Sequence, residues 1–323
     1  MPRGKSDQSR RLIQAAIRIL TDIQPCGVRA VCYQLFVERL TPSMAKPVTN
    51  EVGRHLGDAR DADLFDWHWI VDNTRVTREA GTWASFGALL DTAQRKYRYD
   101  RWQLQPRRCM VWSEKDTVFG TLEPVLDGYG VRYQALHGHA SDTKIREHCE
   151  ASWDLDEPLK VFYVGDYDVA GMDMSERDLR NRIHRYRGNI DLQRIALTHA
   201  DTLDLGRRLG YPAADKGPRV EGGRQIRGDL RYPWYVATYG DWCWELDALN
   251  PNVLRQRVED AITSLIDWPA WERADRVDAA ERSAGEAFVA EWEHFRRHFG
   301  GAPLPESRCA PDANSMGVAE SGT

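Results

Sequence analysis

Apolar positions near the start of the chain recur every three or four residues, which is the spacing of an amphipathic helix. They predict helices over residues 10–20 and 28–39, and a third helix that Thr49 caps. Residues 65–71 (FDWHWIV) alternate at their start and are rich in tryptophan, which predicts a β-strand. Three short helices followed by a β-ribbon are typical of a winged helix-turn-helix domain, which usually lays its third helix in the DNA major groove. A helical module that binds other proteins would show the same pattern.

From residue 109 onward, apolar runs typical of strands alternate with helical patterns. The expected strands are at 109–112, 131–136, 159–164 and 192–197. The expected helices are at 117–126, 141–153 and 173–183, and again from residue 253. This alternation favours a parallel sheet with helices on its faces, so we expect the α/β fold class.

These patterns divide the chain into four consecutive segments. A helical DNA-binding domain is expected over residues 1–105 and a parallel α/β domain over 106–250. A helical extension is expected over 251–299. The last segment, 300–323, is small and polar, and we expect it to be disordered.

Composition narrows the class of protein. The 323 residues are 42% hydrophobic and 29% charged, which is typical of a globular chain, and no apolar run is long enough for a membrane span. No secretory signal follows the basic N-terminus, so a cytoplasmic protein is expected. The net charge is −5, yet residues 1–57 and 95–108 carry an excess of Lys and Arg. Such basic islands either bind a polyanion locally or are ordinary solvated faces.

The six cysteines show neither zinc nor redox spacing. No two of them are separated by two residues, and most lie in apolar segments. We therefore expect reduced, mostly buried thiols and no disulfide framework.

Three carboxylates follow two of the expected strands. Glu114 ends the first strand, and Asp166 and Asp168 end the third. Ligands of open parallel sheets bind beyond the carboxyl ends of the strands, and these two strands can be neighbours. Converging carboxylates repel one another until a divalent cation relieves the repulsion, and hard oxygen ligands suit Mg²⁺. Asp168 could instead cap the following helix, and Lys115 could contact phosphate or pair with an acid.

Tyr33 lies on the second expected helix, away from its apolar stripe, so the core does not need it. Arg29 is one helical turn earlier on the same flank and could orient a phosphate beside it. A phenol has a pKa of about 10, so it attacks phosphorus poorly unless a base, a cation or a metal assists. Tyr33 is therefore either a candidate nucleophile or one of twelve tyrosines with an ordinary structural role.

Further basic residues are candidates for DNA contact. Arg54 and Arg60 are expected to be exposed near the third helix. Residues 217–228 (GPRVEGGRQIRG) are rich in glycine and basic, so they are expected to form a mobile loop or a tolerated insertion. The arginines through which this loop could grip a phosphate backbone are Arg219, Arg224 and Arg227.

Two motifs resemble those of a known family. Residues 29–33 (RAVCY) resemble the Arg-x-x-aromatic-Tyr helix in the A subunit of type IIB DNA topoisomerases (topoisomerase VI), a helix that the meiotic double-strand-break transesterase shares. Glu114 together with residues 166–171 (DYDVAG) resembles the Toprim signature of that family, a Glu and then Asp-x-Asp-Pro-x-Gly. The two motifs occur in the order that the family has.

The resemblance extends over about residues 10–250. Residues 194–198 (RIALT) and 245–249 (ELDAL) also resemble late segments of the family. Two positions depart from the pattern: Val169 stands in place of the proline, and Cys32 in place of the aromatic residue. These departures indicate a divergent, compact relative.

The resemblance implies a winged-helix domain followed by a Toprim-like domain. In this family the last tyrosine of the motif attacks double-stranded DNA and forms a 5′-phosphotyrosyl link, so the resemblance makes Tyr33 the nucleophile and Arg29 a backbone contact. It also implies that Glu114, Asp166 and Asp168 hold Mg²⁺. The family further implies a homodimer, in which the tyrosine of one protomer works over the metal of the other. Strand passage would need a separate ATP-binding, B-type subunit.

Other functions fit the same residues. The chain could be a non-catalytic DNA-binding protein that keeps the fold. It could also be a Toprim metal-dependent nuclease that uses water, for which Tyr33 is dispensable. A phosphatase with an aspartate nucleophile would use Asp166 and Asp168, but it gives no role to Glu114.

Overall fold

A computed structural model of the chain describes residues 7–71, 81–136, 142–221, 224–226 and 228–299. The chain forms two compact units, each built from two separate segments. Unit 1 comprises Met1–Thr74 and Arg107–Leu265, and unit 2 comprises Arg75–Pro106 and Ile266–Thr323. This division differs from the four consecutive segments that the sequence patterns indicate.

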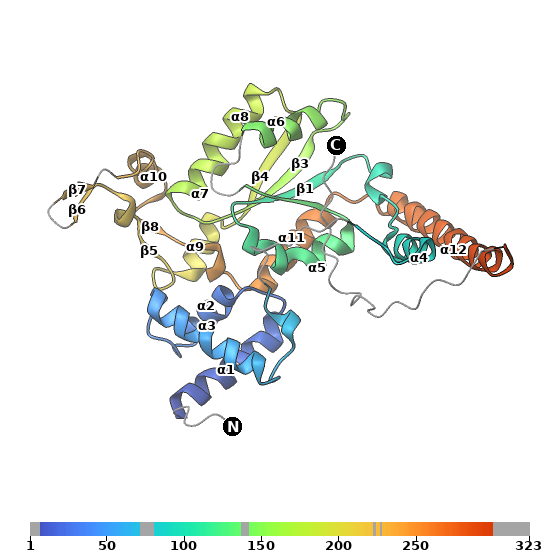
Figure 1. Cartoon of the computed structure of the whole chain (residues 1–323). Helices are drawn as coiled ribbons and strands as arrows, with labels where there is room; N and C mark the ends of the chain where they lie inside the picture. Colours follow the sequence, from blue (N-terminus) through green and yellow to red (C-terminus); the bar gives the residue numbers. More distant parts are fainter. Residues whose placement is uncertain (1–6, 72–80, 137–141, 222–223, 227, 300–323) are drawn as a thin grey trace. The chain divides into compact units, whose positions relative to one another are not determined.

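Three helices form the N-terminal part of unit 1. They are α1 (Asp7–Ile23), α2 (Val28–Val37) and α3 (Lys46–Asp61), drawn in blue in Figure 1. Their apolar sides bury one another, and Leu20, Leu35 and Leu56 are almost wholly enclosed. The three predicted helices are confirmed, but α3 begins earlier than expected, so Thr49 lies inside it and is not its cap. Pro47 occupies the first turn, where a helix leaves its N–H groups unpaired.

The strand predicted at residues 65–71 is wrong. Trp67–Trp69 instead form a 3-10 turn, because the Asp66 side chain caps the turn by accepting a hydrogen bond from the backbone N–H of His68. An isolated bridge between Cys26 and Ile70 is the strand-like pairing that the structure describes in this segment. The described part of the segment therefore contains three helices without the expected β-ribbon.

A four-stranded parallel sheet forms the centre of unit 1 (Figure 1). Its strands are β1 (Cys109–Ser113), β2 (Arg132–Ala135), β3 (Leu159–Val164) and β4 (Ile190–Ala196). Their order is β2-β1-β3-β4, and each neighbouring pair is parallel. The predicted α/β class and the parallel sheet are confirmed.

Helices cover both faces of this sheet. One face carries α6 (Asp142–Ala151) and α8 (Leu179–Arg185), and the other carries α5 (Phe119–Tyr129) and α11 (Pro251–Thr263) (Figure 1). Successive side chains of a strand point to opposite faces. Trp112 and Tyr163 therefore pack in the core with α6 and α8, while the buried Val111 and Phe162 face the other layer.

The two strands that precede the predicted carboxylates are neighbours. Ser113 of β1 pairs with Val164 of β3 at the carboxyl ends of both strands. Glu114 and Asp166 therefore follow adjacent strand ends. This confirms the strand order on which the predicted convergence of carboxylates depends.

Helix α7 (Val169–Asp173) begins directly after β3 and continues through a π-helical turn at Met174–Asp178 into α8. It therefore starts before the helix predicted from residue 173. Gly171 permits this close approach, because a Cβ atom at that position would lie 2.3 Å from the backbone oxygen of Asp166. The helix consequently lies directly against the loop that carries the aspartates.

The remainder of unit 1 is built from short elements. These are α9 (His199–Leu205), β5 (Tyr211–Pro212), β6 (Arg219–Glu221), β7 (Arg224–Ile226), α10 (Tyr232–Tyr239) and β8 (Trp242–Cys243). β5 pairs with β8, and β6 pairs with β7 as an antiparallel hairpin. The glycine-rich segment 217–228, expected to form a loop, thus contains two paired strands among its described residues. Arg227 lies outside the described residues.

Unit 2 is helical. It contains α4 (Phe86–Lys96), the 3-10 turn Arg101–Leu104 and α12 (Trp268–Phe299). Phe86 meets Trp292 edge to face with ring centroids 4.9 Å apart, and Trp102 meets Trp271 in the same way at 5.7 Å. These aromatic contacts explain why residues 81–106 associate with the C-terminal helix. The predicted tail at 300–323 lies outside the described residues.

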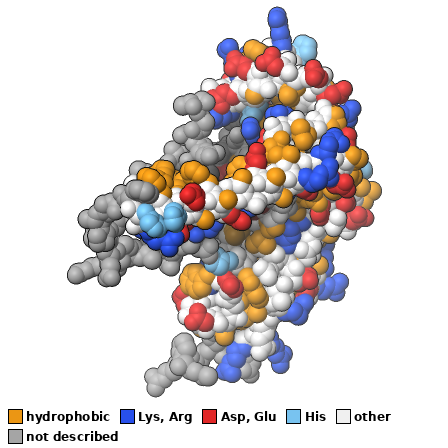
Figure 2. Space-filling model, turned by 90° about the vertical axis from the view of Figure 1, so that its right-hand side faces the viewer, with side chains coloured by type: hydrophobic (Ala, Val, Ile, Leu, Met, Phe, Trp, Pro, Cys, Tyr) orange, Lys and Arg blue, Asp and Glu red, His pale blue; other side chains and the backbone are white. Residues whose placement is uncertain are grey.

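Figure 2 shows one face of the molecule, on which basic, acidic and hydrophobic side chains are interspersed. No single sign of charge dominates the described atoms of this face. None of the described helices combines the length and the apolar character needed to cross a membrane. The five described cysteines are buried and free, as expected; they are Cys26, Cys32, Cys109, Cys149 and Cys243.

Candidate active site

Glu114 is a half-buried carboxylate directly after β1. Burial and the negative charges of Asp166 and Asp168 raise the pKa of Glu114 to about 7. Its Oε2 atom is inaccessible to solvent and has no hydrogen-bond partner among the described residues. An unpaired buried carboxylate oxygen is costly, so this position favours either a proton or a bound cation.

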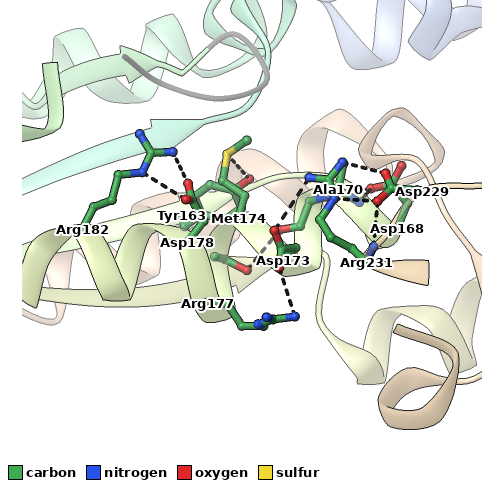
Figure 3. A network of polar contacts seen from close by, with 12 residues as sticks. Tyr163, Asp168, Ala170, Asp173, Met174, Arg177, Asp178, Arg182, Asp229 and Arg231 are labelled. Atoms are coloured by element: carbon green, nitrogen blue, oxygen red, sulfur yellow. Dashed lines mark hydrogen bonds and ion pairs between the residues drawn. The ribbon is translucent and has the colours of Figure 1, made fainter. Parts of the chain in front are cut away.

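Asp168 caps helix α7. Its Oδ1 accepts hydrogen bonds from the backbone N–H groups of Ala170 at 3.0 Å and Gly171 at 2.8 Å (Figure 3). The Tyr211 hydroxyl donates to Oδ2 at 3.3 Å. Burial and the charge of Asp168 raise the pKa of Tyr211, so its hydroxyl stays protonated and can act as the donor. The capping role considered from the sequence is therefore present.

Asp166 is held by two donors. The backbone N–H of Leu246 donates to Oδ1 at 2.9 Å, and the Lys115 ammonium lies 2.7 Å from Oδ2. Burial opposes the charge on Lys115, but Asp166 and Asp247 outweigh that effect and raise the pKa of Lys115. Of the two roles considered for Lys115, the structure describes the pairing with an acid. The ammonium thereby neutralises part of the charge of the carboxylate group.

Arg194 donates hydrogen bonds to the backbone around Asp166 and Asp168. Its Nη1 donates to the carbonyl oxygens of Gly165 at 3.0 Å and Leu197 at 2.9 Å. Its Nη2 donates to those of Asp166 at 3.1 Å and Gly171 at 2.7 Å. One guanidinium therefore joins β4 to the loop after β3 and to the start of α7.

A second polar network flanks Asp168 on the side of α7. The Asp173 carboxylate lies 3.5 Å from Arg177 and 3.7 Å from Arg231, and Arg231 also pairs with Asp229 at 2.7 Å (Figure 3). This network links α7 to the segment before α10. It balances the charge of Asp173, which lies close to the candidate site.

Tyr33 is buried, with 4% of its surface exposed, but it is not part of the core that α1, α2 and α3 share. Its hydroxyl donates to Glu245 Oε2 at 3.2 Å. The Arg29 guanidinium carbon lies 5.7 Å from the centre of the Tyr33 ring. Tyr33 thus lies outside the cluster of the three helices, as its place off the apolar stripe indicates, but it is buried, because α2 also packs against the 3-10 turn that follows Glu245.

Arg29 pairs with two carboxylates. Its Nε donates to the same Glu245 Oε2 at 2.7 Å and lies 3.3 Å from Asp247 Oδ2. Burial, above all, raises the pKa of Asp247 to about 6, and the charges of Asp166 and Glu245 act in the same direction. Burial and the charge of Glu245 also raise the pKa of Tyr33, so the phenol is protonated.

These contacts form one connected group within unit 1. The chain runs from Glu245 through Leu246 to Asp247, and the backbone of Leu246 holds Asp166. Tyr33 on α2 is therefore linked to the carboxyl edge of the sheet through a single three-residue segment. The sequence motifs did not identify Glu245, Asp247 or Arg194 as site residues; the only sign of them was that residues 194–198 and 245–249 resemble family segments.

The donor chemistry at the edge of the sheet suits a divalent cation. Glu114, Asp166 and Asp168 supply hard oxygen atoms, and the unpaired oxygen of Glu114 is the kind of atom a cation would satisfy. Within the described residues, no three His, Cys, Asp or Glu side chains are already arranged as a metal site. For a cation to bind Asp166 here, the Lys115 ammonium would therefore have to leave that carboxylate.

The candidate DNA contacts differ in their surroundings. Arg54 is exposed on α3, as expected. Arg60 is only partly exposed: it donates to the backbone oxygens of Trp67 and Ile70, and its guanidinium lies 4.4 Å from the centre of the Trp67 ring. The expectation of an exposed Arg60 is therefore wrong, because the 3-10 turn engages its side chain. The structure describes the backbone of Arg219 and Arg224 in the β6–β7 hairpin.

No family model, no curated protein and no solved structure matches this chain. What the site can do is therefore inferred from its own geometry and chemistry.

Proposed function

We propose that this protein cleaves DNA by transferring a backbone phosphate to Tyr33, in the manner of the type IIB topoisomerase A subunit. The observation that carries the proposal is the connected group that joins Tyr33 to Asp166 through Glu245 and Leu246. A buried phenol, a neighbouring guanidinium and a carboxylate edge are the parts that a tyrosine transesterase needs. Under this proposal the helical segment acts as a winged-helix-like DNA reader and the sheet acts as a Toprim-like centre.

In the proposed reaction the Tyr33 oxygen attacks the phosphorus atom of a DNA phosphodiester. The tyrosyl O–P bond forms, the bond from phosphorus to the 3′-oxygen breaks, and the 5′-phosphate remains on the protein. Arg29 lies beside the nucleophile and would orient the phosphate through charge-assisted hydrogen bonds. Mg²⁺ held by Glu114, Asp166 and Asp168 would supply positive charge for the phosphate and the leaving oxygen.

The remaining partners follow from the same proposal. Double-stranded DNA would contact Arg54 and the β6–β7 hairpin. When the cation binds, Lys115 would leave Asp166 and contact a DNA phosphate instead. Lys115 would then have both roles considered for it, pairing with an acid and contacting phosphate. We further propose a homodimer, because two protomers are needed to cut both strands, and a separate B-type ATPase subunit where strand passage occurs. In this dimer each Tyr33 would act beside the carboxylates of its own protomer, since the contacts that link Tyr33 to Asp166 lie within one chain. The proposal differs in this respect from the arrangement that the family resemblance implies, in which the tyrosine works over the metal of the other protomer.

The test is formation of a covalent adduct. The full chain is incubated with double-stranded DNA and Mg²⁺, denatured with detergent, and assayed for protein-linked DNA. We expect an adduct that depends on Mg²⁺ and is lost in Tyr33→Phe. Tyr129→Phe is the matched control, because Tyr129 also donates to a glutamate, Glu259, at 2.9 Å but lies outside the candidate site. An adduct that persists in Tyr33→Phe would contradict the proposal.

A second candidate function is that of a non-catalytic DNA-binding protein, and the ion pair between Lys115 and Asp166 is the observation that favours it. A lysine that fills the position of a cation is compatible with a centre that binds no metal. This candidate predicts DNA binding without Mg²⁺ and without any adduct, and binding unchanged by Asp166→Ala. A third outcome, Mg²⁺-dependent cleavage without an adduct, would instead indicate a nuclease that uses water.

A further inference from the structure

Glu245 lies at the centre of the contacts around Tyr33. Its Oε2 atom accepts hydrogen bonds both from the Tyr33 hydroxyl at 3.2 Å and from Arg29 Nε at 2.7 Å. Tyr33 and Glu245 are 212 residues apart, so this contact is made by the tertiary fold and not by local sequence. The 3-10 turn Leu246–Ala248 follows Glu245 and fixes its backbone.

A tyrosine in this environment needs a proton acceptor before it can attack phosphorus. Tyr33 is buried, and the negative charges of Glu245 and Asp247 raise its pKa further, so it does not ionise unaided. Its proton must therefore leave during the reaction to a group already in contact with it. Glu245 is the acceptor of the Tyr33 hydroxyl hydrogen bond in the described part of the chain.

We propose that Glu245 is the general base that takes the proton from Tyr33 as the tyrosine attacks DNA. This inference rests on the proposed function. The proton passes from Tyr33 Oη to Glu245 Oε2 while the O–P bond forms, and the departing 3′-oxygen takes its proton from solvent. In the reverse reaction, Glu245 returns the proton to Tyr33 as the DNA strand is resealed. Arg29 acts as a positioning residue that holds the carboxylate toward the phenol.

Four other groups interact electrostatically with Tyr33 or Glu245. Arg29 comes from α2, Asp247 from the 3-10 turn, Lys115 from the loop after β1 and Tyr211 from β5. Asp247 is the closest match to Glu245, because it also carries a carboxylate beside Arg29. It has no hydrogen bond with the Tyr33 hydroxyl among the described contacts. Asp247→Asn therefore changes the charge near Arg29 without removing the proton acceptor.

The test measures the rate of Tyr33–DNA adduct formation by the full chain with Mg²⁺, between about pH 6 and pH 9. Glu245→Gln is expected to slow the reaction about 100-fold or more near neutral pH. Its remaining rate should rise with pH, because hydroxide must replace the carboxylate, whereas the wild-type rate should reach a plateau. Asp247→Asn is expected to slow the reaction about tenfold or less and to keep the wild-type profile.

The inference is overturned if Glu245→Gln matches Asp247→Asn in both rate and pH profile. Thermal unfolding checks that each variant folds. If Glu245→Gln does not fold, Glu245→Asp replaces it in the test. A rate that is lower than that of the wild type but still reaches a plateau supports the inference, because the shortened side chain still carries a base. A rate that rises steadily with pH overturns the inference. Failure of the proposed function looks different, because then the wild type forms no adduct or Tyr33→Phe forms it undiminished.

Discussion

The backbone N–H of Leu246 donates a buried hydrogen bond to Asp166 Oδ1 at 2.9 Å. Asp166 follows a central strand, whereas Leu246 follows the glutamate that contacts Tyr33. A hydrogen bond to one carboxylate oxygen fixes the direction in which the other oxygen points. The segment that engages the tyrosine therefore also orients a carboxylate at the edge of the sheet.

Glu114→Gln should make the metal-free protein more stable above neutral pH. The folded state raises the pKa of Glu114 from 4.5 to about 7, so the folded protein holds an extra proton between these values and loses stability as pH rises through this window. One pKa unit corresponds to about 1.4 kcal/mol, so we expect the amide to raise the free energy of unfolding by about 1–3 kcal/mol at pH 8. The gain should largely disappear near pH 4.5.

Urea unfolding of the wild type and the variant at both pH values measures this effect. Glu147→Gln is the matched control, because Glu147 is exposed and pairs with Lys144 on the helix surface, and it should change stability by about 0.5 kcal/mol or less. Parallel pH curves for wild type and Glu114→Gln would contradict the prediction.

Mg²⁺ should stabilise the wild type more at pH 8 than at pH 6. A cation that binds Glu114 must displace its proton, and burial together with Asp166 and Asp168 keeps that proton bound up to about pH 7. At a free Mg²⁺ concentration ten times Kd, the gain is about 1.4 kcal/mol. Thermal unfolding with Mg²⁺, against NaCl of equal ionic strength, measures it. Equal effects of the two salts, or an undiminished gain in Glu114→Gln, would count against a site at Glu114.

Arg194→Lys should destabilise unit 1 by about 2–4 kcal/mol. The side chain of lysine has one nitrogen atom and cannot reproduce the five hydrogen bonds that Arg194 donates to backbone oxygens, so carbonyl groups lose their partners. Arg180→Lys is the control, because Arg180 is exposed and pairs with Glu176 at 3.4 Å on the surface of the helix. Chemical denaturation measures both. If the two variants lose similar amounts of stability, Arg194 does not hold β4, the loop after β3 and the start of α7 together.

Gly171→Ala should displace α7 from the loop that carries the aspartates. The added Cβ would lie 2.3 Å from the Asp166 backbone oxygen, so we expect a loss of about 2 kcal/mol or more. Gly57→Ala, on the exposed side of α3, meets nothing within 4 Å and should stabilise the protein by about 0.5–1 kcal/mol. Denaturant midpoints compare the pair. Similar shifts for both would argue against close packing of α7.

The sheet was predictable because its central strands are buried on both faces. The run at 159–164 coincides with β3, since such a strand reads as continuous apolar residues. The tryptophan-rich run at 65–71 carries a similar signal, but there Asp66 caps a 3-10 turn. Local pattern alone does not reveal whether a partner strand is present. The association of residues 81–106 with α12 likewise depends on aromatic contacts between distant segments.

The candidate site was predictable only where strand order determines it. Glu114 and Asp166 follow neighbouring strands, so their proximity follows from the α/β pattern. The roles of Lys115 and Glu245 depend on side chains that meet across long stretches of sequence, which residue types and spacing do not encode. For Tyr33, the sequence predicted a position off the apolar stripe of its helix, but it did not predict the hydrogen bond with Glu245.

The distance along the chain between Tyr33 and Glu245 has a consequence for biosynthesis. Glu245 is the 212th residue after Tyr33, so at roughly 5–20 residues per second the ribosome reaches it roughly 10–40 s later. Helix α2 can form early, but during that interval its phenol lacks Glu245 as a partner. A nascent or prematurely terminated chain would therefore carry the tyrosine without the group that contacts it. The contact between Tyr33 and Glu245 is in this way postponed until most of the polypeptide has been made.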